Sequence, residues 1–296
     1  MNSLINTLSG TGVALVTPFK KNNEVDFDAL EKVINFVIDN GVEYIVTLGT
    51  TGETPTLTKK EQVDIVNFTV EKVNNRVPLV LGIGGNNTAE IINHFGDFDL
   101  EKITAILSSS PNYNKPSQEG IFQHYKAIAE HSTLPVILYN VPGRTGSNIT
   151  AETTIRLARE CENIKGIKEA SGNMVQCMYI LKNMPDDFLF VSGDDHISLP
   201  LVACGSKGVI SVAANCFPKD FSDMMRAALK NDFTTAQKLH YKLLPGYDLL
   251  FIENNPAGVK GFMSELNLIE NVLRLPLVPL SPANHQKVKD FLASIS

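Results

Sequence analysis

Residues 135–170 decide the fold of this chain. They read PVILYN at 135–140, TAETTIRLARE at 150–160 and KGIKEA at 165–170. The outer two runs have the length of strands, and the first of them is apolar like a buried strand. The middle run has apolar residues at helical spacing. Two strands joined by one helix lie parallel, with a right-handed crossover. The stretch therefore predicts a strand, helix, strand unit of an α/β protein.

The same unit repeats outward in both directions along the chain. Strict alternation with short connections predicts a parallel sheet. A count of eight strands favours closure into a (β/α)8 TIM barrel over an open doubly wound sheet. The predicted strands are 12–17, 44–48, 78–83, 105–109, 135–140, 165–170, 189–193 and 208–213.

Several of the predicted helices begin with residues that can cap them. Asp26, Thr58, Ser117 and Thr150 are placed to accept an early backbone N–H, and Thr58 with Glu61 forms a capping-box pattern. The caps support the helical periodicity. The predicted helices are 26–40, 58–74, 88–95, 117–130 and 150–160.

The strand signal ends after about Lys230. Helical pieces follow at 233–244, 256–265 and 283–294, and Pro245-Gly246 and a proline-rich run separate them. No long flexible linker precedes these pieces, so we expect them to pack on the barrel. The prediction is a catalytic barrel over 1–230 and a C-terminal helical region over 231–296.

The composition excludes several classes of protein. The chain has 296 residues, with 26 Lys and Arg against 32 Asp and Glu, a net charge of −6. Such a chain lacks the basic field that binds nucleic acid phosphates. No apolar run reaches the roughly 18 residues of a transmembrane helix, and residues 1–10 lack the features of a signal peptide. We therefore expect a cytoplasmic protein that binds neither nucleic acid nor membranes.

The cysteines and one acidic run give no clear metal signal. Cys161, Cys177, Cys204 and Cys216 lie far apart, which predicts reduced thiols packed in the interior rather than disulfides or a zinc site. The run Asp194-Asp195-His196 follows a strand and opens a predicted helix. Helix capping therefore fits this run better than metal binding.

Lys168 is the most informative candidate for chemistry. Side-chain alternation along 164–170 can aim Lys168 into the barrel while Ile167 and Glu169 point outward. Desolvation there favours the neutral amine, which is the form that attacks a ketone to make a Schiff base. The alternative is a lysine at a strand end whose ammonium reaches solvent.

Further polar residues follow strands at the same end of the barrel, where active sites of such barrels lie. Tyr139 ends a strand and could relay protons for an amine on the next strand, or it could close the barrel with its hydroxyl in water. The turn GTTGE at 49–53 could bind a small carboxylate, or it could be only a turn. Arg144 offers a bidentate fork to a second carboxylate, and its alternative is a surface salt bridge.

The chain resembles the dihydrodipicolinate synthase family, within the pyruvate-dependent Schiff-base lyases that include N-acetylneuraminate lyase. The resemblance covers essentially the whole chain, and the order and spacing of its motifs carry it. The motifs are GVALVTPF at 12–19, GTTGE at 49–53, PNYNKP at 111–116, YNVPGRTG at 139–146, IKEASG at 167–172 and NPAGVK at 255–260.

The resemblance implies a role for each catalytic candidate. Lys168 forms the imine with pyruvate, and the turn with Thr50 and Thr51 holds the pyruvate carboxylate. Tyr139 shuttles protons with Thr50 and with Tyr113, which a neighbouring subunit supplies. Imine formation makes pyruvate an electron sink, so its methyl group loses a proton to give an enamine that attacks an aldehyde. No metal or organic cofactor is expected.

The resemblance also implies the second substrate and the assembly. Arg144 matches the residue that binds the carboxylate of L-aspartate 4-semialdehyde, and backbone carbonyls of Gly193 and Ile210 line the same pocket. The implied reaction is the first committed step toward diaminopimelate and lysine, in a homotetramer built as a dimer of dimers. Two alternatives stay open: a lyase of N-acetylneuraminate or a 2-keto-3-deoxy sugar acid, and a keto-acid binding protein without turnover.

Part of the family's effector pocket is also matched. Asn86 and Glu90 fit it, whereas Lys59, Gln62 and Asn112 stand where lysine-sensitive members carry two histidines and a tyrosine. Lys59 places a like charge near a cationic effector, which weakens binding. We therefore expect weak or absent inhibition by lysine.

Overall fold

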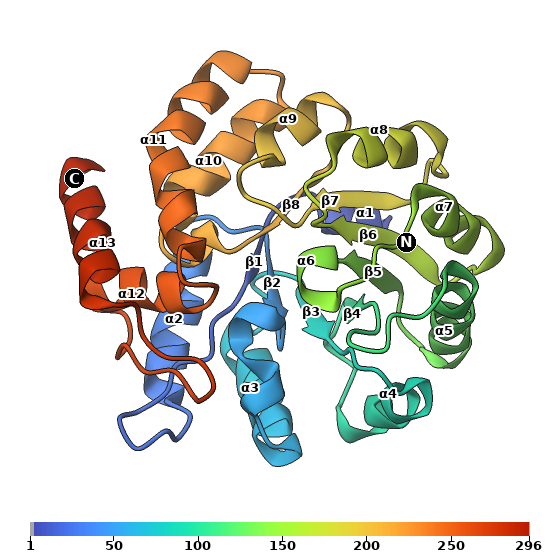
Figure 1. The fold of residues 1–296 in the computed structure, drawn as a ribbon, viewed down its shortest axis with the longest axis horizontal. Coiled ribbons are helices and arrows are strands. Elements are labelled where there is room, and N and C mark those ends of the chain that lie inside the picture. The colour runs from blue at the N-terminus through green and yellow to red at the C-terminus, as the bar shows by residue number, and fades with distance from the viewer. Residues whose placement is uncertain (1–2, 296) are drawn as a thin grey trace.

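Eight parallel strands close into a barrel in the computed structural model, which describes residues 3–295 (Figure 1). The strands follow one another around the barrel in chain order, and β8 pairs with β1 to complete it. The predicted (β/α)8 fold is confirmed, and all eight predicted strands overlap an observed one. They are β1 (Gly10–Ala14), β2 (Tyr44–Thr47), β3 (Leu79–Gly82), β4 (Ala105–Ser109), β5 (Val136–Asn140), β6 (Ile164–Glu169), β7 (Leu189–Ser192) and β8 (Gly208–Ser211).

The first strand ends earlier than predicted. It stops at Ala14, whereas the sequence predicts a strand to residue 17. The side chain of Asn215 accounts for the difference. Its Nδ2 donates to the carbonyl oxygen of Ala14 at 2.9 Å, and its Oδ1 accepts from the backbone N–H of Val16 at 3.2 Å. A side chain therefore takes over hydrogen bonds where the chain leaves the barrel.

Helices surround the barrel, and the four predicted caps are confirmed. The side chains of Asp26, Ser117 and Thr150 each accept a backbone N–H from the first turn of a helix, and Thr58 with Glu61 forms the capping box. The helices up to the last strand are α1 (Leu4–Thr7), α2 (Phe27–Asp39), α3 (Lys59–Val73), α4 (Thr88–His94), α5 (Gln118–His131), α6 (Pro142–Thr145), α7 (Ala151–Glu160), α8 (Met174–Asn183) and α9 (Ser198–Ala203).

Two apolar layers follow from the alternation of side chains along the strands. Ile137 and Tyr139 of β5 belong to the cluster inside the barrel, together with Ile210 of β8. Ile167 of β6 belongs to the cluster between the barrel and its helices. Leu4 of α1 packs against the inner cluster. Inward and outward positions therefore alternate as the strand period requires.

Four α-helices follow β8 within residues 3–295, and one predicted break is wrong. They are α10 (Pro218–Leu229), α11 (Phe233–Phe251), α12 (Ala257–Glu265) and α13 (Pro282–Ile295). Pro245 was expected to end a helix, but α11 continues through it. A Cβ on Gly246 would lie 2.7 Å from Cε1 of Phe291, so α13 packs directly on the backbone of α11. Tertiary packing thus outweighs the roughly 3 kcal/mol that an interior proline costs. The division at residue 230 stays a prediction.

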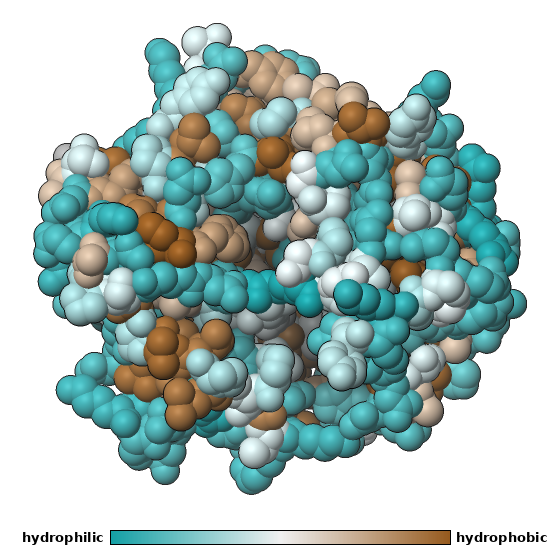
Figure 2. All heavy atoms as spheres, in the orientation of Figure 1, coloured by the Kyte–Doolittle hydropathy of each residue, from teal (hydrophilic) through white to brown (hydrophobic). Residues whose placement is uncertain are grey.

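The face shown in Figure 2 is largely hydrophilic, with an apolar patch over the loop between α12 and α13, where Leu275 and Val278 are exposed. None of the helices within residues 3–295 has the length and apolarity to cross a bilayer.

Cys161, Cys177 and Cys216 are buried free thiols as predicted, but Cys204 is exposed. Cys204 follows the last turn of α9, which leaves its side chain at the surface.

The capping role predicted for residues 194–196 is wrong. Helix α9 begins at Ser198, and no side chain caps it. Asp195 is instead buried, and its Oδ2 accepts the backbone N–H groups of Val212 at 3.1 Å and Ala213 at 2.8 Å. Asp195 therefore holds the turn after β8, and burial raises the pKa of its carboxyl to about 6. In the described part of the chain, no three His, Cys, Asp or Glu side chains cluster as metal ligands would.

His196 links the loop after β7 to α11 and predicts a dependence of stability on pH. Its Nδ1 lies 3.4 Å from Asp194 Oδ1, and its Nε2 lies 2.9 Å from Asp248 Oδ1. The hydrogen bond to Asp194, aided by Asp248, raises the pKa of His196 from 6.5 to about 9. The stabilisation is therefore complete below about pH 6.5 and is lost as the pH rises through 9.

The variant Asp248→Asn should lose on the order of 1 kcal/mol of unfolding free energy at pH 6, because solvent screens this partly exposed pair. At pH 10 the variant and the wild type should have nearly equal stability. Urea denaturation at both pH values measures the difference. An equal loss at pH 6 and pH 10 would show that the charge of His196 is not involved.

Candidate active site

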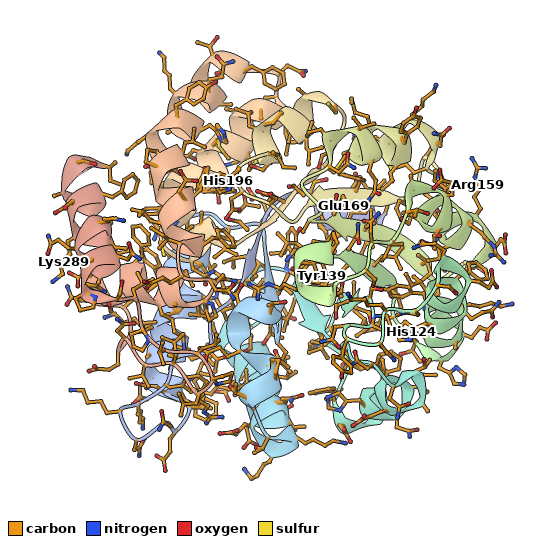
Figure 3. All side chains as sticks on the ribbon, viewed as in Figure 1. His124, Tyr139, Arg159, Glu169, His196 and Lys289 are labelled. Atoms are coloured by element: carbon orange, nitrogen blue, oxygen red, sulfur yellow. The ribbon has the colours of Figure 1, made fainter. Side chains whose placement is uncertain are left out.

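Lys168 and Tyr139 face each other inside the barrel. The pairing of β5 with β6 places them opposite one another, and Lys168 Nζ lies 4.2 Å from the centre of the Tyr139 ring. Only 5% of Lys168 and 8% of Tyr139 are exposed. Both line a cavity of about 400 Å³, and Figure 3 labels Tyr139 beside α6 near the middle of the barrel. The solvent-exposed alternative for Lys168 is therefore wrong. Tyr139 lines the same cavity, and its role as a proton relay stays a prediction.

Gly193 makes room for the extended lysine. A Cβ at this position would lie 2.9 Å from Lys168 Cε and 3.0 Å from Lys168 Cγ. Any larger residue would push the lysine stem away from the loop after β7. Ile210 lies deeper, 1% exposed, within the apolar cluster inside the barrel. Gly193 therefore adjoins the lysine, but neither residue is part of the cavity wall, and the role of their backbone carbonyls stays a prediction.

A comparison of two buried lysines shows what distinguishes Lys168. Lys260 Nζ lies 2.5 Å from Glu53 Oε1 and donates to the carbonyl oxygen of Val272 at 2.9 Å. Burial lowers the pKa of Lys260 to about 8, and Glu53 opposes that shift. Within residues 3–295, by contrast, no carboxylate lies within 4.0 Å of Lys168 Nζ and no hydrogen-bond partner satisfies it. Lys168 is thus the buried lysine whose amine is unpaired and faces a cavity.

The Gly-Thr-Thr-Gly turn forms part of the cavity wall. It is a short 3-10 helix, η1 (Thr50–Gly52), directly after β2. Thr50 lines the cavity, and Thr51 lies buried behind it, where its Oγ1 accepts from Asn255 Nδ2 at 2.9 Å. Thr17 Oγ1 donates to the carbonyl oxygen of Gly52 at 2.7 Å. Two distant segments therefore hold this turn in one position.

Arg144 is held by the segment that precedes α12. It lies exposed on α6, five residues after Tyr139, and its Nη2 donates to the carbonyl oxygen of Asn255 at 3.1 Å and to Asn254 Oδ1 at 3.2 Å. No carboxylate within residues 3–295 forms an ion pair with it. The salt-bridge alternative is therefore wrong, and the guanidinium has no carboxylate partner within the described chain.

Tyr113 does not join the other candidates within one chain. It lies in the loop after β4 with 90% of its surface exposed, and it is not part of the cavity wall. An exposed tyrosine so close to the barrel end is compatible with a role in a neighbouring subunit. That role stays a prediction.

The residues of the matched effector pocket lie at the α3 and α4 side of the same cavity. Glu90 lines it together with Lys59 and Gln62. Asn86 Oδ1 accepts from the backbone N–H of Asn112 at 2.9 Å. The structure therefore brings these side chains to one region, and the expected weak inhibition by lysine stays a prediction.

Sequence reasoning assigned no site role to Asn255 or to the Glu53 and Lys260 pair. These contacts join residues about 200 positions apart, which no local pattern reveals. One signal was present for Lys260, because it stands alone within the otherwise uncharged helix α12 segment 257–263. A lysine in such a run indicates a buried charge that requires a partner.

The fold and the cavity define a class, the (β/α)8 barrels with an unpaired lysine of the sixth strand at a cavity. The chain belongs to the Dihydrodipicolinate synthetase family, whose model matches residues 7–295. A protein from Parabacteroides distasonis named 4-hydroxy-tetrahydrodipicolinate synthase is 50% identical to it over 289 residues, which cover 98% of this chain and 97% of that one.

Solved structures agree with this assignment. The crystal structure of dihydrodipicolinate synthase from Aquifex aeolicus is 41% identical, has a TM-score of 0.94 and covers 97% of this chain and 98% of its own. A chloride-inhibited dihydrodipicolinate synthase from Acinetobacter baumannii, complexed with pyruvate, is 39% identical with a TM-score of 0.95 and covers 98% of this chain and 99% of its own.

Proposed function

We propose that this chain acts as a 4-hydroxy-tetrahydrodipicolinate synthase, which condenses pyruvate with L-aspartate 4-semialdehyde in the first committed step of diaminopimelate and lysine biosynthesis. The observation that carries the mechanism is the unpaired amine of Lys168 in the cavity. The names of the relatives support the choice of reaction. The pyruvate complex of the Acinetobacter baumannii protein supports the first substrate.

The chemistry begins at Lys168 Nζ. The neutral amine attacks the ketone carbon of pyruvate, the ketone oxygen takes up protons and leaves as water, one of them supplied by a neighbouring acid, and a protonated imine forms. A base then removes a proton from the methyl group, and the electron pair moves toward the imine nitrogen to give an enamine. The enamine carbon attacks the aldehyde carbon of the second substrate, whose oxygen takes up a proton. The α-amino group of the second substrate finally attacks the imine carbon, which closes the ring of the product, and the bond to Lys168 Nζ breaks to release the lysine amine.

The surrounding residues bind, orient and move protons. The ring of Tyr139 lies beside the lysine amine, and its hydroxyl exchanges protons with the oxygen that leaves the pyruvate ketone. Thr50 lines the same cavity and takes part in this proton exchange. Thr50 and Thr51 bind the pyruvate carboxylate, and the backbone carbonyls of Gly193 and Ile210 complete the proposed substrate pocket. Arg144 binds the carboxylate of the semialdehyde through two parallel hydrogen bonds.

Turnover of pyruvate with L-aspartate 4-semialdehyde, coupled to the next reductase of the pathway, tests the proposal. Borohydride reduction in the presence of pyruvate should also attach pyruvate covalently to the protein. Failure of both reactions would contradict the proposed function. Trapping without condensation, together with cleavage of N-acetylneuraminate or a 2-keto-3-deoxy sugar acid, would instead establish the sibling lyase activity.

We also propose a homotetramer, built as a dimer of dimers in the cytoplasm, in which Tyr113 completes a neighbour's proton relay. Because Tyr113 is 90% exposed in its own chain, Tyr113→Phe should leave the subunit folded and lower turnover by about 10²-fold. Steady-state kinetics and circular dichroism measure the two effects. Unchanged kinetics would remove Tyr113 from the mechanism.

A further inference from the structure

Asn255 contacts both groups to which the proposed function assigns a substrate carboxylate. It is 4% exposed and stands just before α12. Its side-chain Nδ2 donates to Thr51 Oγ1 at 2.9 Å, and its backbone carbonyl accepts from Arg144 Nη2 at 3.1 Å. One residue of the C-terminal region therefore links the turn after β2 to the helix after β5.

The hydrogen bond to Thr51 determines where the threonine proton can go. A hydroxyl group donates once and accepts through its lone pairs, whereas an amide NH₂ group can only donate. Thr51 Oγ1 is therefore the acceptor in this bond and keeps its own proton. Within residues 3–295 that proton has no acceptor at hydrogen-bond distance. It remains available to an anionic group bound at the turn.

The segment carrying Asn255 is itself held firmly. Glu53 ends the turn after η1 with a left-handed φ of 54°, a conformation that is unfavourable for a non-glycine residue. The buried ion pair between Glu53 and Lys260 of α12 lies beside it, and Glu53 Oε2 accepts the backbone N–H of Arg274 at 3.1 Å. The turn and the segment are thus joined at two points, Thr51 with Asn255 and Glu53 with Lys260.

We propose that Asn255 is a positioning residue that orients the Thr51 hydroxyl toward the pyruvate carboxylate and, through its backbone, sets the place of Arg144. The inference rests on the proposed function, because that function assigns pyruvate to the turn. The side chain serves the first substrate and the backbone carbonyl serves the second. Removal of the Asn255 side chain should therefore weaken the binding of pyruvate and leave the binding of the semialdehyde unchanged.

The variant Asn255→Ala tests this separation. It removes the bond to Thr51 and keeps the carbonyl that Arg144 contacts. The KM for pyruvate should rise about three- to tenfold, the equivalent of one hydrogen bond, while the KM for the semialdehyde stays within a factor of two. Asn254→Gly is the matched control, because it removes the other Arg144 acceptor at a left-handed residue that tolerates glycine. It should raise only the semialdehyde KM.

A double-mutant cycle with Thr51→Val distinguishes positioning from general packing. If Asn255 acts through the Thr51 hydroxyl, then Asn255→Ala adds no further rise in pyruvate KM once that hydroxyl is absent. The proposal would be overturned if the fold-rises in pyruvate KM of the two single variants multiply in the double variant. It would also be overturned if Asn255→Ala raises the KM values for pyruvate and for the semialdehyde equally. If Asn255→Ala does not fold, as judged by circular dichroism, Asn255→Ser replaces it, because its side chain is too short to reach Thr51.

Borohydride trapping separates this inference from the proposed function. The pyruvate concentration that gives half-maximal trapping should rise in Asn255→Ala as the KM does, without any need for the aldehyde. A wild type that traps no pyruvate would overturn the function and the inference together. If the wild type traps pyruvate, but the fold-rises in half-maximal pyruvate concentration caused by Asn255→Ala and by Thr51→Val multiply in the double variant, the inference alone is overturned.

Discussion

Lys168→Ala is expected to abolish borohydride trapping of pyruvate and to lower turnover by on the order of 10⁴-fold or more, as removal of a nucleophile does in other enzymes. The covalent intermediate requires an amine at the cavity, and the Lys168 amine lies there unpaired, beside Tyr139. The alanine variant should stay folded, because no ion pair or hydrogen bond of Lys168 is lost with it. Mass spectrometry after reduction and steady-state kinetics measure the two effects.

Lys59 provides the matched control for this experiment. It lines the same cavity from α3, but its side chain is exposed. Lys59 therefore lacks the buried position opposite Tyr139 that the proposed chemistry uses at Lys168. Lys59→Ala should therefore trap pyruvate as the wild type does. Trapping that persists in Lys168→Ala and disappears in Lys59→Ala would move the nucleophile to α3.

Glu53→Gln is expected to destabilise the protein by about 3–5 kcal/mol, the cost of leaving one charge of a buried pair without its partner. Both side chains of the Glu53 and Lys260 pair are fully buried, and Lys260 also lies over the ring of Phe19, with its Nζ 4.2 Å from the ring centre. Because the turn after β2 depends on this pair, the loss should also reduce pyruvate binding. Urea denaturation at pH 7 measures the change in unfolding free energy.

Two further variants sharpen this prediction. The double variant Glu53→Gln with Lys260→Met should lose less stability than the sum of the single variants, because it leaves no unpaired buried charge. The exposed pair of Lys60 and Asp64 on α3 is the control. Lys60→Met should hardly change the stability, since solvent screens that pair. A loss of less than about 1 kcal/mol in Glu53→Gln would show that the buried pair does not stabilise the fold.

The barrel was predictable because it depends on local periodicity. Eight apolar runs alternate with amphipathic segments, and each of Asp26, Thr58, Ser117 and Thr150 caps the predicted helix. The same alternation correctly aimed Lys168 inward and Ile167 outward. Local rules failed where a distant residue intervened. Asn215 ends β1 early, and the packing of Phe291 against Gly246 keeps α11 helical beyond Pro245.

The sequence by itself determined the fold class, the strand ends that carry Lys168 and Tyr139, and the family resemblance, because strand period, helix period and caps are properties of neighbouring residues. Only the tertiary structure decided which of the two buried lysines is paired, and it alone joined Thr51 and Arg144 to Asn255. Those contacts span more than a hundred residues of chain. Their geometry depends on how the barrel closes and where the C-terminal helices pack, so no short-range pattern encodes it.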